Sequence, residues 1–445
     1  MKQRTLTLAV TSALLGMTAQ VQAAGFQLAE YSATGLGRAY AGEAAMADNA
    51  AAQFRNPAML TYLKGTQVSA GGILVMPNID IEGHTVAVDM TGKPLAAPVA
   101  TQANDIADAA FVPNFYLSHQ LNDDLYLGLA LATNFGMATE LEDSFKGTQF
   151  GNEAAVTTME INPNIAYRIN DQFSVGAGVR MVLGEGSIGA KSSADVPMFG
   201  VQTGDTLKYM KGDDIAWGWQ LGGAWQINAD NRIGVNYRSA VDLDLEGHAK
   251  GFAFNLAAVK MGLAPQAEYA GSMELTLPAT AEIASFHQLT DKFAMHASIN
   301  WTDWSSFEKL EAEIPYLVAA PNQLVKQENW RDNYRFAIGG TYQLDDQSVL
   351  RAGVAYDKSA VTDANRTLTI PEMDRYWFSL GYGYKYSNNL TLDAGVTYIL
   401  ADESPVTEPR PGIESDKSSA LFGGAFMGST SGDLLLFGVQ ASYKF

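Results

Sequence analysis

From about residue 65 onward, apolar residues alternate with polar or small residues along the chain. In residues 376–386, aromatic and leucine side chains occupy every second position, and serine, glycine and lysine fill most of the others. Residues 350–357 and 390–400 divide in the same way. Because successive side chains of a strand point to opposite faces, this alternation predicts strands with one apolar face and one polar or small face.

The connections between these runs are alternately short and long. Short polar turns occur at residues 122–124, 170–171 and 388–389, and long segments such as 189–213 and 403–432 lie between turns. The strands of a soluble β-sandwich also alternate between apolar and polar residues, but short turns at one end and long loops at the other are typical of outer-membrane barrels. We therefore predict an all-β membrane protein, an antiparallel transmembrane β-barrel of about fourteen strands. The strands are expected at residues 66–80, 111–120, 125–137, 155–168, 173–187, 214–227, 232–247, 273–287, 293–303, 331–343, 348–358, 374–386, 390–402 and 433–445.

The first residues have the features of a signal peptide. Lys2 and Arg4 precede an apolar run over residues 6–17, and Val21-Gln22-Ala23 has the small-x-small form of a cleavage site. Removal of residues 1–23 leaves 27 of the 29 basic residues against 48 acidic ones, a net charge of −21. This charge argues against a nucleic-acid partner. The chain has no cysteine and its histidines show no metal-ligand spacing, so we expect no disulfide, metal or cofactor.

Residues 24–63 do not alternate and are rich in alanine and glycine. Eight strands can fill a barrel with side chains and sixteen leave an aqueous channel, so about fourteen leave a lumen that needs a filler. We therefore expect residues 24–63 to form short helices that fold back as a hatch, or plug, into the barrel of residues 64–445. A disordered periplasmic tail is the alternative, but the low charge and apolar content of the segment count against it.

Several short motifs together resemble one family of transporters. They are Gly25-Phe-Gln-Leu28, Gly35-Leu-Gly-Arg-Ala-Tyr40, Gly42-Glu43, Asn56-Pro57-Ala58, Leu277-Pro278, Trp304-Ser305 with Phe307, Tyr334-Arg335, and Ile370-Pro371 with Asp374-Arg375 and Trp377. With these motifs, essentially the whole mature chain resembles the FadL family of outer-membrane transporters for long-chain fatty acids and related hydrophobic compounds. The resemblance implies a plugged fourteen-stranded barrel in the outer membrane of a Gram-negative bacterium. We expect it to be a monomer surrounded by outer-membrane lipid and lipopolysaccharide.

The resemblance also implies a route for the ligand. The ligand adsorbs among the extracellular loops, passes to a pocket beside the N-terminus of the hatch, and leaves sideways next to a kinked third strand after the hatch shifts. In this sequence Phe26 matches the hatch residue at the inner pocket, and Asn56, Pro57 and Ala58 are expected near the side opening. In the matching third strand, residues 125–137, we expect the kink at Asn134-Phe135-Gly136, because glycine often marks a bulge or bend.

Two lysines and one apolar loop are the candidates for ligand contacts outside the hatch. Lys326 aligns with a basic residue that the family places near the ligand carboxylate. The family's second basic position falls near Ala190, where Lys191 is a substitute in shifted register. Loss of that second cation leaves open a neutral ligand such as an alkane or an aromatic compound. At helical spacing, Phe252, Leu256 and Val259 in the apolar loop 252–263 are expected to line the groove at the entrance, or only to pack on neighbouring loops.

Other functions are disfavoured by particular features. A hydrolase would need a positioned histidine near the outer rim, but His287 and His296 lie close to a tight turn at the periplasmic end, so we expect no catalytic residues and no enzyme. The hatch and the apolar loop disfavour a general porin. An adhesin or phage-receptor barrel stays open, because loops perform such roles without readable motifs. The sequence leaves open the ligand's chain length and the trigger of hatch movement. Our prediction is ligand-gated passive diffusion of a long-chain fatty acid or another hydrophobic small molecule.

Overall fold

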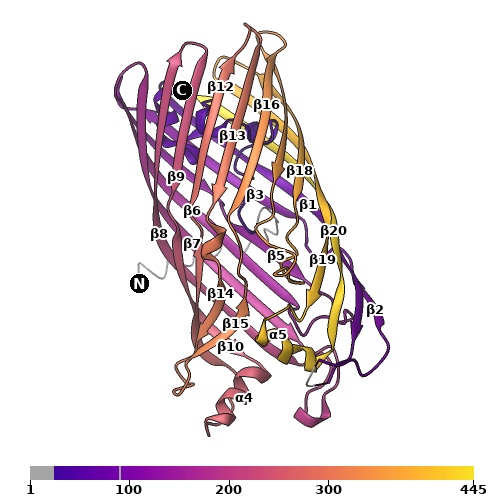
Figure 1. Ribbon diagram of the computed structural model, residues 1–445. Helices are drawn as coiled ribbons and strands as arrows, with labels where there is room; N and C mark the ends of the chain where they lie inside the picture. The colour runs from indigo at the N-terminus through magenta and orange to yellow at the C-terminus, as the bar shows by residue number, and fades with distance from the viewer. Residues whose placement is uncertain (1–24, 90–91) are drawn as a thin grey trace.

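The computed structural model describes residues 25–89 and 92–445, which form a closed β-barrel (Figure 1). The expected signal peptide, residues 1–23, lies outside the described residues. All strands belong to one antiparallel sheet. The first strand, β1 (Thr66–Val86), pairs with the last, β20 (Ala425–Lys444), from Gln67 opposite Lys444 to Val86 opposite Ala425. This pairing leaves the barrel without a free edge between its first and last strands.

The barrel wall has fourteen staves, by which we mean the strand or pair of consecutive strands that crosses the wall once. A short extra strand, β2 (Val99–Ala103), pairs with the loop-side end of β1. The predicted fold, a fourteen-stranded antiparallel barrel with an N-terminal helical hatch, is therefore confirmed. After β1, the staves are β3 (Ala110–Gln120), β4 (Leu125–Ala132) with β5 (Gly136–Glu140), β6 (Glu153–Arg168), β7 (Phe173–Lys191), β8 (Thr206–Asn228), β9 (Asn231–Arg238) with β10 (Val241–Lys250), β11 (Tyr269–Leu277) with β12 (Thr280–Gln288), β13 (Phe293–Thr302) with β14 (Lys309–Glu313), β15 (Asn322–Gln327) with β16 (Asn333–Gln343), β17 (Ser348–Asp357), β18 (Arg375–Lys385), β19 (Leu390–Glu408) and β20.

Several staves are longer than the sequence predicts. β7 has 19 residues and β8 has 23, whereas a tilted strand spans a bilayer with about 9–11 residues. The extra length lies at the end with the long loops, where β8 begins at Thr206 rather than at residue 214. Because neighbouring strands continue to pair there, the barrel wall extends past the part that crosses the membrane.

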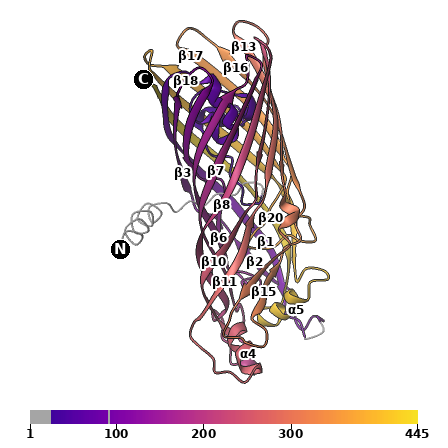
Figure 2. The same ribbon diagram turned by 90° about the vertical axis from the view of Figure 1, so that its left-hand side faces the viewer.

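The short turns and the long loops lie at opposite ends of the barrel (Figures 1 and 2). The helices α4 (Phe252–Lys260) and α5 (Glu414–Ser419) lie at the loop end, while the C-terminus lies at the turn end. Short 3-10 helices also occur in the connections, at η3 (Pro197–Phe199), η4 (Trp304–Ser306) and η5 (Ala420–Phe422). No helix among the described residues is long and apolar enough to cross a membrane.

The hatch folds into the turn-end half of the barrel as four short helical segments (Figure 1). The side chain of Ser32 caps the first helix by accepting a hydrogen bond from the Gly35 amide, and Asn56 caps the last by accepting one from the Ala58 amide. Nearly all hatch side chains are buried. The segments are α2 (Ala33–Leu36), η1 (Glu43–Ala45), α3 (Ala52–Arg55) and η2 (Pro57–Tyr62).

Wall glycines let the backbone of the hatch approach the barrel closely. A Cβ atom added to Gly353 would lie 2.1 Å from the Arg38 carbonyl oxygen, and one added to Gly234 would lie 1.8 Å from the Ala44 carbonyl oxygen. Neither position therefore admits a side chain while the hatch stays in place. The small inward faces of the predicted strands form the seat of the hatch.

Candidate functional site

An apolar column runs through the loop-side half of the barrel. We use this name for one cluster of buried apolar side chains that joins α4 and the strands beneath it to the N-terminus of the hatch. Because each member is at least nine-tenths buried, the column is the region best able to surround a hydrophobic chain. Its members are Phe26, Phe135, Met137, Ala154, Val182, Ile188, Met210, Val241, Leu243, Leu245, Ala249, Phe254, Ala258, Tyr269, Met273, Leu275, Leu277, Trp304, Phe307, Leu310, Ala312, Ile314, Leu317, Val325, Trp330, Ala360, Val361 and Ile370.

Phe26 forms the hatch end of this column and is 1% exposed. Its ring centroid lies 4.6 Å from that of Trp304, 5.6 Å from Phe307, 6.0 Å from Trp330 and 6.1 Å from Phe135. Most of these pairs meet edge to face, the geometry that aromatic quadrupoles favour. The sequence-predicted pocket residue is therefore enclosed by aromatic side chains from the third stave, from the loop after β13 and from the segment between β15 and β16.

The third stave is interrupted where Phe26 meets it. β4 ends at Ala132 and β5 begins at Gly136, so residues 133–135 leave the ladder. The hatch supplies two hydrogen bonds at this break, from the Leu28 amide to the Asn134 carbonyl oxygen and from the Gly136 amide to the Phe26 carbonyl oxygen, both 2.8 Å. The hatch N-terminus thus acts as a short strand added to the inside of the wall.

Thr158 of β6 supplies the other hydrogen bonds at the break. Its hydroxyl donates to the Phe135 carbonyl oxygen at 2.6 Å and accepts from the Phe135 amide at 3.2 Å. One side chain therefore replaces the two ladder hydrogen bonds that the displaced residue loses. Sequence analysis did not identify Thr158, because a threonine on a strand carries no sign of this role.

The neighbouring strand β3 is unpaired beside the break. Within residues 25–89 and 92–445, residues 110–114 pair with β1 but with no strand on their other side, because β5 pairs only with β6. The side-chain amide groups of Asn114 and Asn134 are buried here, and neither side chain has a hydrogen-bond partner among the described residues. The strand pairing of the wall is therefore interrupted between β3 and β5, where Asn134, Phe135 and Gly136 lie.

Asn56, Pro57 and Ala58 lie elsewhere. The Asn56 side chain donates to the Ala44 carbonyl oxygen at 2.6 Å and to the Gly223 carbonyl oxygen of β8 at 3.0 Å. A Cβ atom on Gly176 of β7 would lie 2.5 Å from the Ala58 amide nitrogen. These residues dock the hatch on β7 and β8, so the structure does not bring them together with the break between β4 and β5.

The two sequence-predicted lysines are both paired with carboxylates. Lys326 is 3% exposed, and its ammonium lies 3.0 Å from Glu408 Oε1 and donates to the Phe150 carbonyl oxygen at 3.0 Å. Lys191 is half-buried, and its ammonium lies 2.7 Å from Asp143 Oδ1. The sequence carries no sign of the partner Glu408, which ends β19, 82 residues along the chain from Lys326 in β15.

A buried carboxyl follows Lys326 at the edge of the column. Glu328 accepts a hydrogen bond from the indole nitrogen of Trp330 at 3.1 Å, and burial raises the pKa of Glu328.

Within residues 25–89 and 92–445, no three histidine, aspartate or glutamate side chains are grouped so that they could hold a metal ion.

The apolar loop forms α4, but the buried face of the helix differs from the predicted one. Phe254 and Ala258 are buried, and the ring of Phe254 lies 6.4 Å from that of Tyr269. Phe252 is half-buried and packs on Phe199 and Phe422, with ring centroids 5.8 Å and 5.6 Å away.

The other two predicted groove residues also differ in exposure. Leu256 is half-buried, and Val259 is 55% exposed. Nearly every side chain of this short helix is apolar, so helical spacing alone did not decide which face it buries.

Ion pairs hold the hatch to itself and to the wall. Arg38 lies 2.6 Å from Glu43 and 2.8 Å from Asp48, all within the hatch. Arg55 lies 3.1 Å from Glu282 of β12, which also accepts a hydrogen bond from the Ala44 amide. Removing one member of such a buried pair leaves an uncompensated charge, so these contacts fix the body of the hatch.

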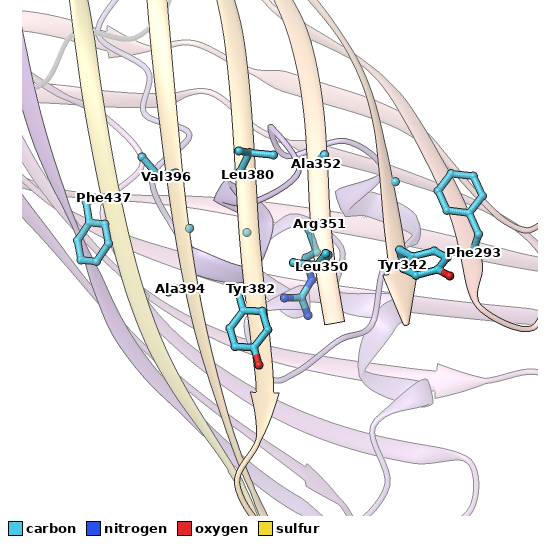
Figure 3. A pocket seen from close by; sticks show the side chains of 13 residues that line it. Phe293, Tyr342, Leu350, Arg351, Ala352, Leu380, Tyr382, Ala394, Val396 and Phe437 are labelled. Atoms are coloured by element: carbon cyan, nitrogen blue, oxygen red, sulfur yellow. The ribbon is translucent and has the colours of Figure 1, made fainter. Parts of the chain in front are cut away.

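The outer wall carries a separate hollow of about 740 Å³ over β16 to β20 (Figure 3). The rings of Phe293, Tyr342, Tyr382 and Phe437 surround it, and glycines and alanines form its floor. These ring side chains are exposed on the outward face of the barrel, which in a bilayer contacts lipid. This hollow therefore belongs to the lipid-facing surface of the barrel and is separate from the apolar column inside it.

Comparison with known proteins gives matches over nearly the whole chain. The family model described as outer membrane protein transport protein (OMPP1/FadL/TodX) matches residues 14–445. A long-chain fatty acid transport protein of Escherichia coli O6:H1 is 34% identical over 456 residues, which cover 96% of this chain and 99% of that protein. Outer membrane protein P1 of Haemophilus influenzae is 34% identical over 464 residues, with 98% of each covered. A solved structure of a Pseudomonas aeruginosa FadL homologue has a TM-score of 0.81 and 25% identity, covering 95% of this chain and 100% of that one.

Proposed function

Because this chain belongs to the outer membrane protein transport family OMPP1/FadL/TodX, we propose that it carries long-chain fatty acids across the outer membrane by ligand-gated passive diffusion. It is an outer-membrane protein that transports hydrophobic compounds. Relatives that are 31–34% identical and named long-chain fatty acid transport proteins support this substrate class. The family is one of transport proteins, and our proposal includes no catalysis. We also propose a monomer surrounded by outer-membrane lipid and lipopolysaccharide.

The observation that carries the proposal is the apolar column, which runs from α4 to Phe26. A buried methylene gains about 0.8 kcal/mol, so fifteen methylenes of an acyl chain gain on the order of 12 kcal/mol before entropy costs. The column therefore supplies most of the affinity. Since its side chains pack on one another in the structure, a ligand must displace some of them, and Phe26 lies at the end where the ligand arrives last.

Displacement of Phe26 would release the break in the third stave. The Phe26 carbonyl oxygen and the Leu28 amide hold that break with two backbone hydrogen bonds, so a shift of the hatch N-terminus would break both. The unpaired edge of β3 then gives an opening toward the membrane at residues 110–114. We propose that Asn134, Phe135 and Gly136 form this lateral gate and that the ligand leaves through it into the outer membrane. Asn56, Pro57 and Ala58 would keep the rest of the hatch docked.

One observation favours a second candidate, a neutral hydrocarbon. Lys326 already has a carboxylate partner, so its charge gives a fatty acid little advantage over an alkane unless Glu408 moves. In the first candidate, Lys326 and Lys191 orient the head group, while Phe252, Leu256 and Val259 guide the ligand from the loops. Both candidate ligands, the fatty acid and the neutral hydrocarbon, would occupy the apolar column, and they differ only in whether a charged head group is present.

Equilibrium binding to the purified, detergent-refolded protein tests the proposal. Oleate and octadecene are titrated into the wild type, Phe26→Ala and Lys326→Ala. A matched control is Phe54→Ala, since Phe54 is equally buried in the hatch but lies outside the apolar column. We expect tight oleate binding that falls strongly in Phe26→Ala, modestly in Lys326→Ala and little in the control. Preference for octadecene with a silent Lys326→Ala would reassign the substrate, and absence of binding to both would overturn the proposal.

A further inference from the structure

A third lysine lies beside Lys326 and differs from the two predicted ones. Lys208, near the loop end of β8, is half-buried, and its ammonium donates a hydrogen bond to the Val325 carbonyl oxygen at 2.5 Å. Among residues 25–89 and 92–445, no carboxylate lies within ion-pair distance of it. The cation thus has a neutral backbone acceptor where Lys326 and Lys191 have acids.

The other charges around Lys208 cancel in pairs. The charged groups that act on it most strongly are Lys326, Asp416, Glu408 and Arg410. Lys326 is paired with Glu408 at 3.0 Å, and Arg410 Nε with Asp416 Oδ2 at 2.7 Å. These four groups form two ion pairs, which leaves Lys208 as the one cation of the five without a carboxylate partner. The Glu328 carboxyl also acts on Lys326 and Arg410, but burial raises its pKa and so disfavours its negative charge.

Lys208 also adjoins the apolar column. Val325, whose carbonyl accepts its hydrogen bond, is a column member and is 3% exposed. Met210, two residues further along β8 and hence on the same face as Lys208, is another member. An unmatched ammonium at the edge of an apolar column is complementary to an amphiphile with one anionic end.

We propose that Lys208 binds the carboxylate of the transported ligand while the acyl chain lies in the apolar column. This inference rests on the proposed function and names the residue that distinguishes a fatty acid from a neutral hydrocarbon. The ligand carboxylate replaces a neutral carbonyl as the partner of Lys208, and the pair of Lys326 with Glu408 stays intact.

Binding of oleate and oleyl alcohol to the refolded full chain tests the assignment, because the two ligands share a tail and differ in the charge of the head. The variants are Lys208→Gln, which keeps a donor for the Val325 carbonyl, and Lys208→Arg, which keeps the charge. Lys250→Gln is the matched control, since it removes a half-buried lysine at the loop end of β10, the strand that pairs with β8 beside Lys208.

We expect Lys208→Gln to weaken oleate binding on the order of ten-fold, the size of one hydrogen bond to a charged group, and to leave oleyl alcohol binding unchanged. Lys208→Arg should retain most of the oleate affinity, and Lys250→Gln should change the binding of neither ligand. Oleate binding that is insensitive to Lys208→Gln, or an equal loss for both ligands, would overturn the role of Lys208 and leave the transport function standing. Failure of the wild type to bind either ligand would overturn the proposed function itself.

Discussion

Replacing Phe26 by alanine tests whether the hatch N-terminus closes the break in the third stave. Phe26 is 1% exposed, and four aromatic rings surround it within 6.1 Å, centroid to centroid. The two hydrogen bonds to the break flank this side chain, one from the Leu28 amide and one to the Phe26 carbonyl oxygen. If the ring anchors the segment, its loss should free both bonds together.

The expected free-energy cost of Phe26→Ala follows from the burial of the Phe26 side chain. Truncating a buried phenylalanine to alanine costs about 3–5 kcal/mol. Between Phe26 and Leu28, Gln27 also accepts a hydrogen bond from the Thr302 hydroxyl of β13 at 2.6 Å, but Phe26 contributes the ring cluster, so most of this cost should fall on the local opening equilibrium of the segment. Since each 1.4 kcal/mol is a factor of ten, local opening should become about 10² to 10³ times more frequent.

Amide hydrogen exchange of the refolded protein measures this opening directly. The amides of Leu28 and Gly136 donate the two bonds, so their protection should fall together by about two to three powers of ten, or to the limit of full exposure. Phe54→Ala removes an equally buried ring from another part of the hatch and should leave the Gly136 amide protected. Unchanged protection of Gly136 in Phe26→Ala would refute the reasoning, because the break would then be closed by other contacts.

Three further changes test separate parts of the site. Thr158→Val keeps the shape but removes both hydrogen bonds to Phe135, so the Phe135 amide should exchange faster by an amount equivalent to about 1–3 kcal/mol, and no change would exclude this support. Glu408→Gln leaves Lys326 buried without a carboxylate and should destabilise the protein by about 3–5 kcal/mol in thermal melts in detergent, and adding Lys326→Met should restore much of the loss. Burial raises the pKa of Glu372, in the loop before β18, from 4.5 to about 7. The stabilisation that protonated Glu372 gives to the docked loop is therefore complete below its ordinary pKa of 4.5, and it is lost as the pH rises through about 7. Proteolysis of residues 358–374 should be faster at about pH 8.5 than at about pH 5.5, and Glu372→Gln should remove the difference.

The fold was predictable because a membrane barrel repeats one constraint. Every strand that crosses the bilayer must alternate, so each of the fourteen staves left its own signal, and the turn residues separated them. The loop-side extensions were missed because that requirement ends at the membrane. β19 continues to Glu408, six residues past the predicted end at residue 402, where pairing with β20 alone maintains the strand.

The site was predictable only where a local motif marks it. Phe26 and the Asn134-Phe135-Gly136 break came from the resemblance and from a glycine in a strand, and both lie at one point of the structure. The partner of Lys326 and the free charge of Lys208 depend on how the loop-side ends of β8, β15 and β19, which are distant in the sequence, pack together. Alternation along the chain predicts which face of the sheet a side chain lies on, but it does not predict which distant segment of the chain that side chain contacts.

The contacts of the hatch divide it into a fixed part and a releasable part, and this division determines the route. Wall glycines such as Gly353 and Gly234 touch the hatch backbone directly, and the Arg55–Glu282 ion pair fixes it to β12, so the body of the hatch cannot move without exposing a buried charge. The N-terminal residues of the hatch are held by two backbone hydrogen bonds, by the hydrogen bond from Thr302 to Gln27 and by one ring cluster, and an acyl chain in the column can replace the apolar contacts of that cluster. A ligand can therefore open the wall between β3 and β5 while the body of the hatch still blocks the axis of the barrel. That arrangement admits a hydrophobic compound sideways and keeps water-soluble solutes out.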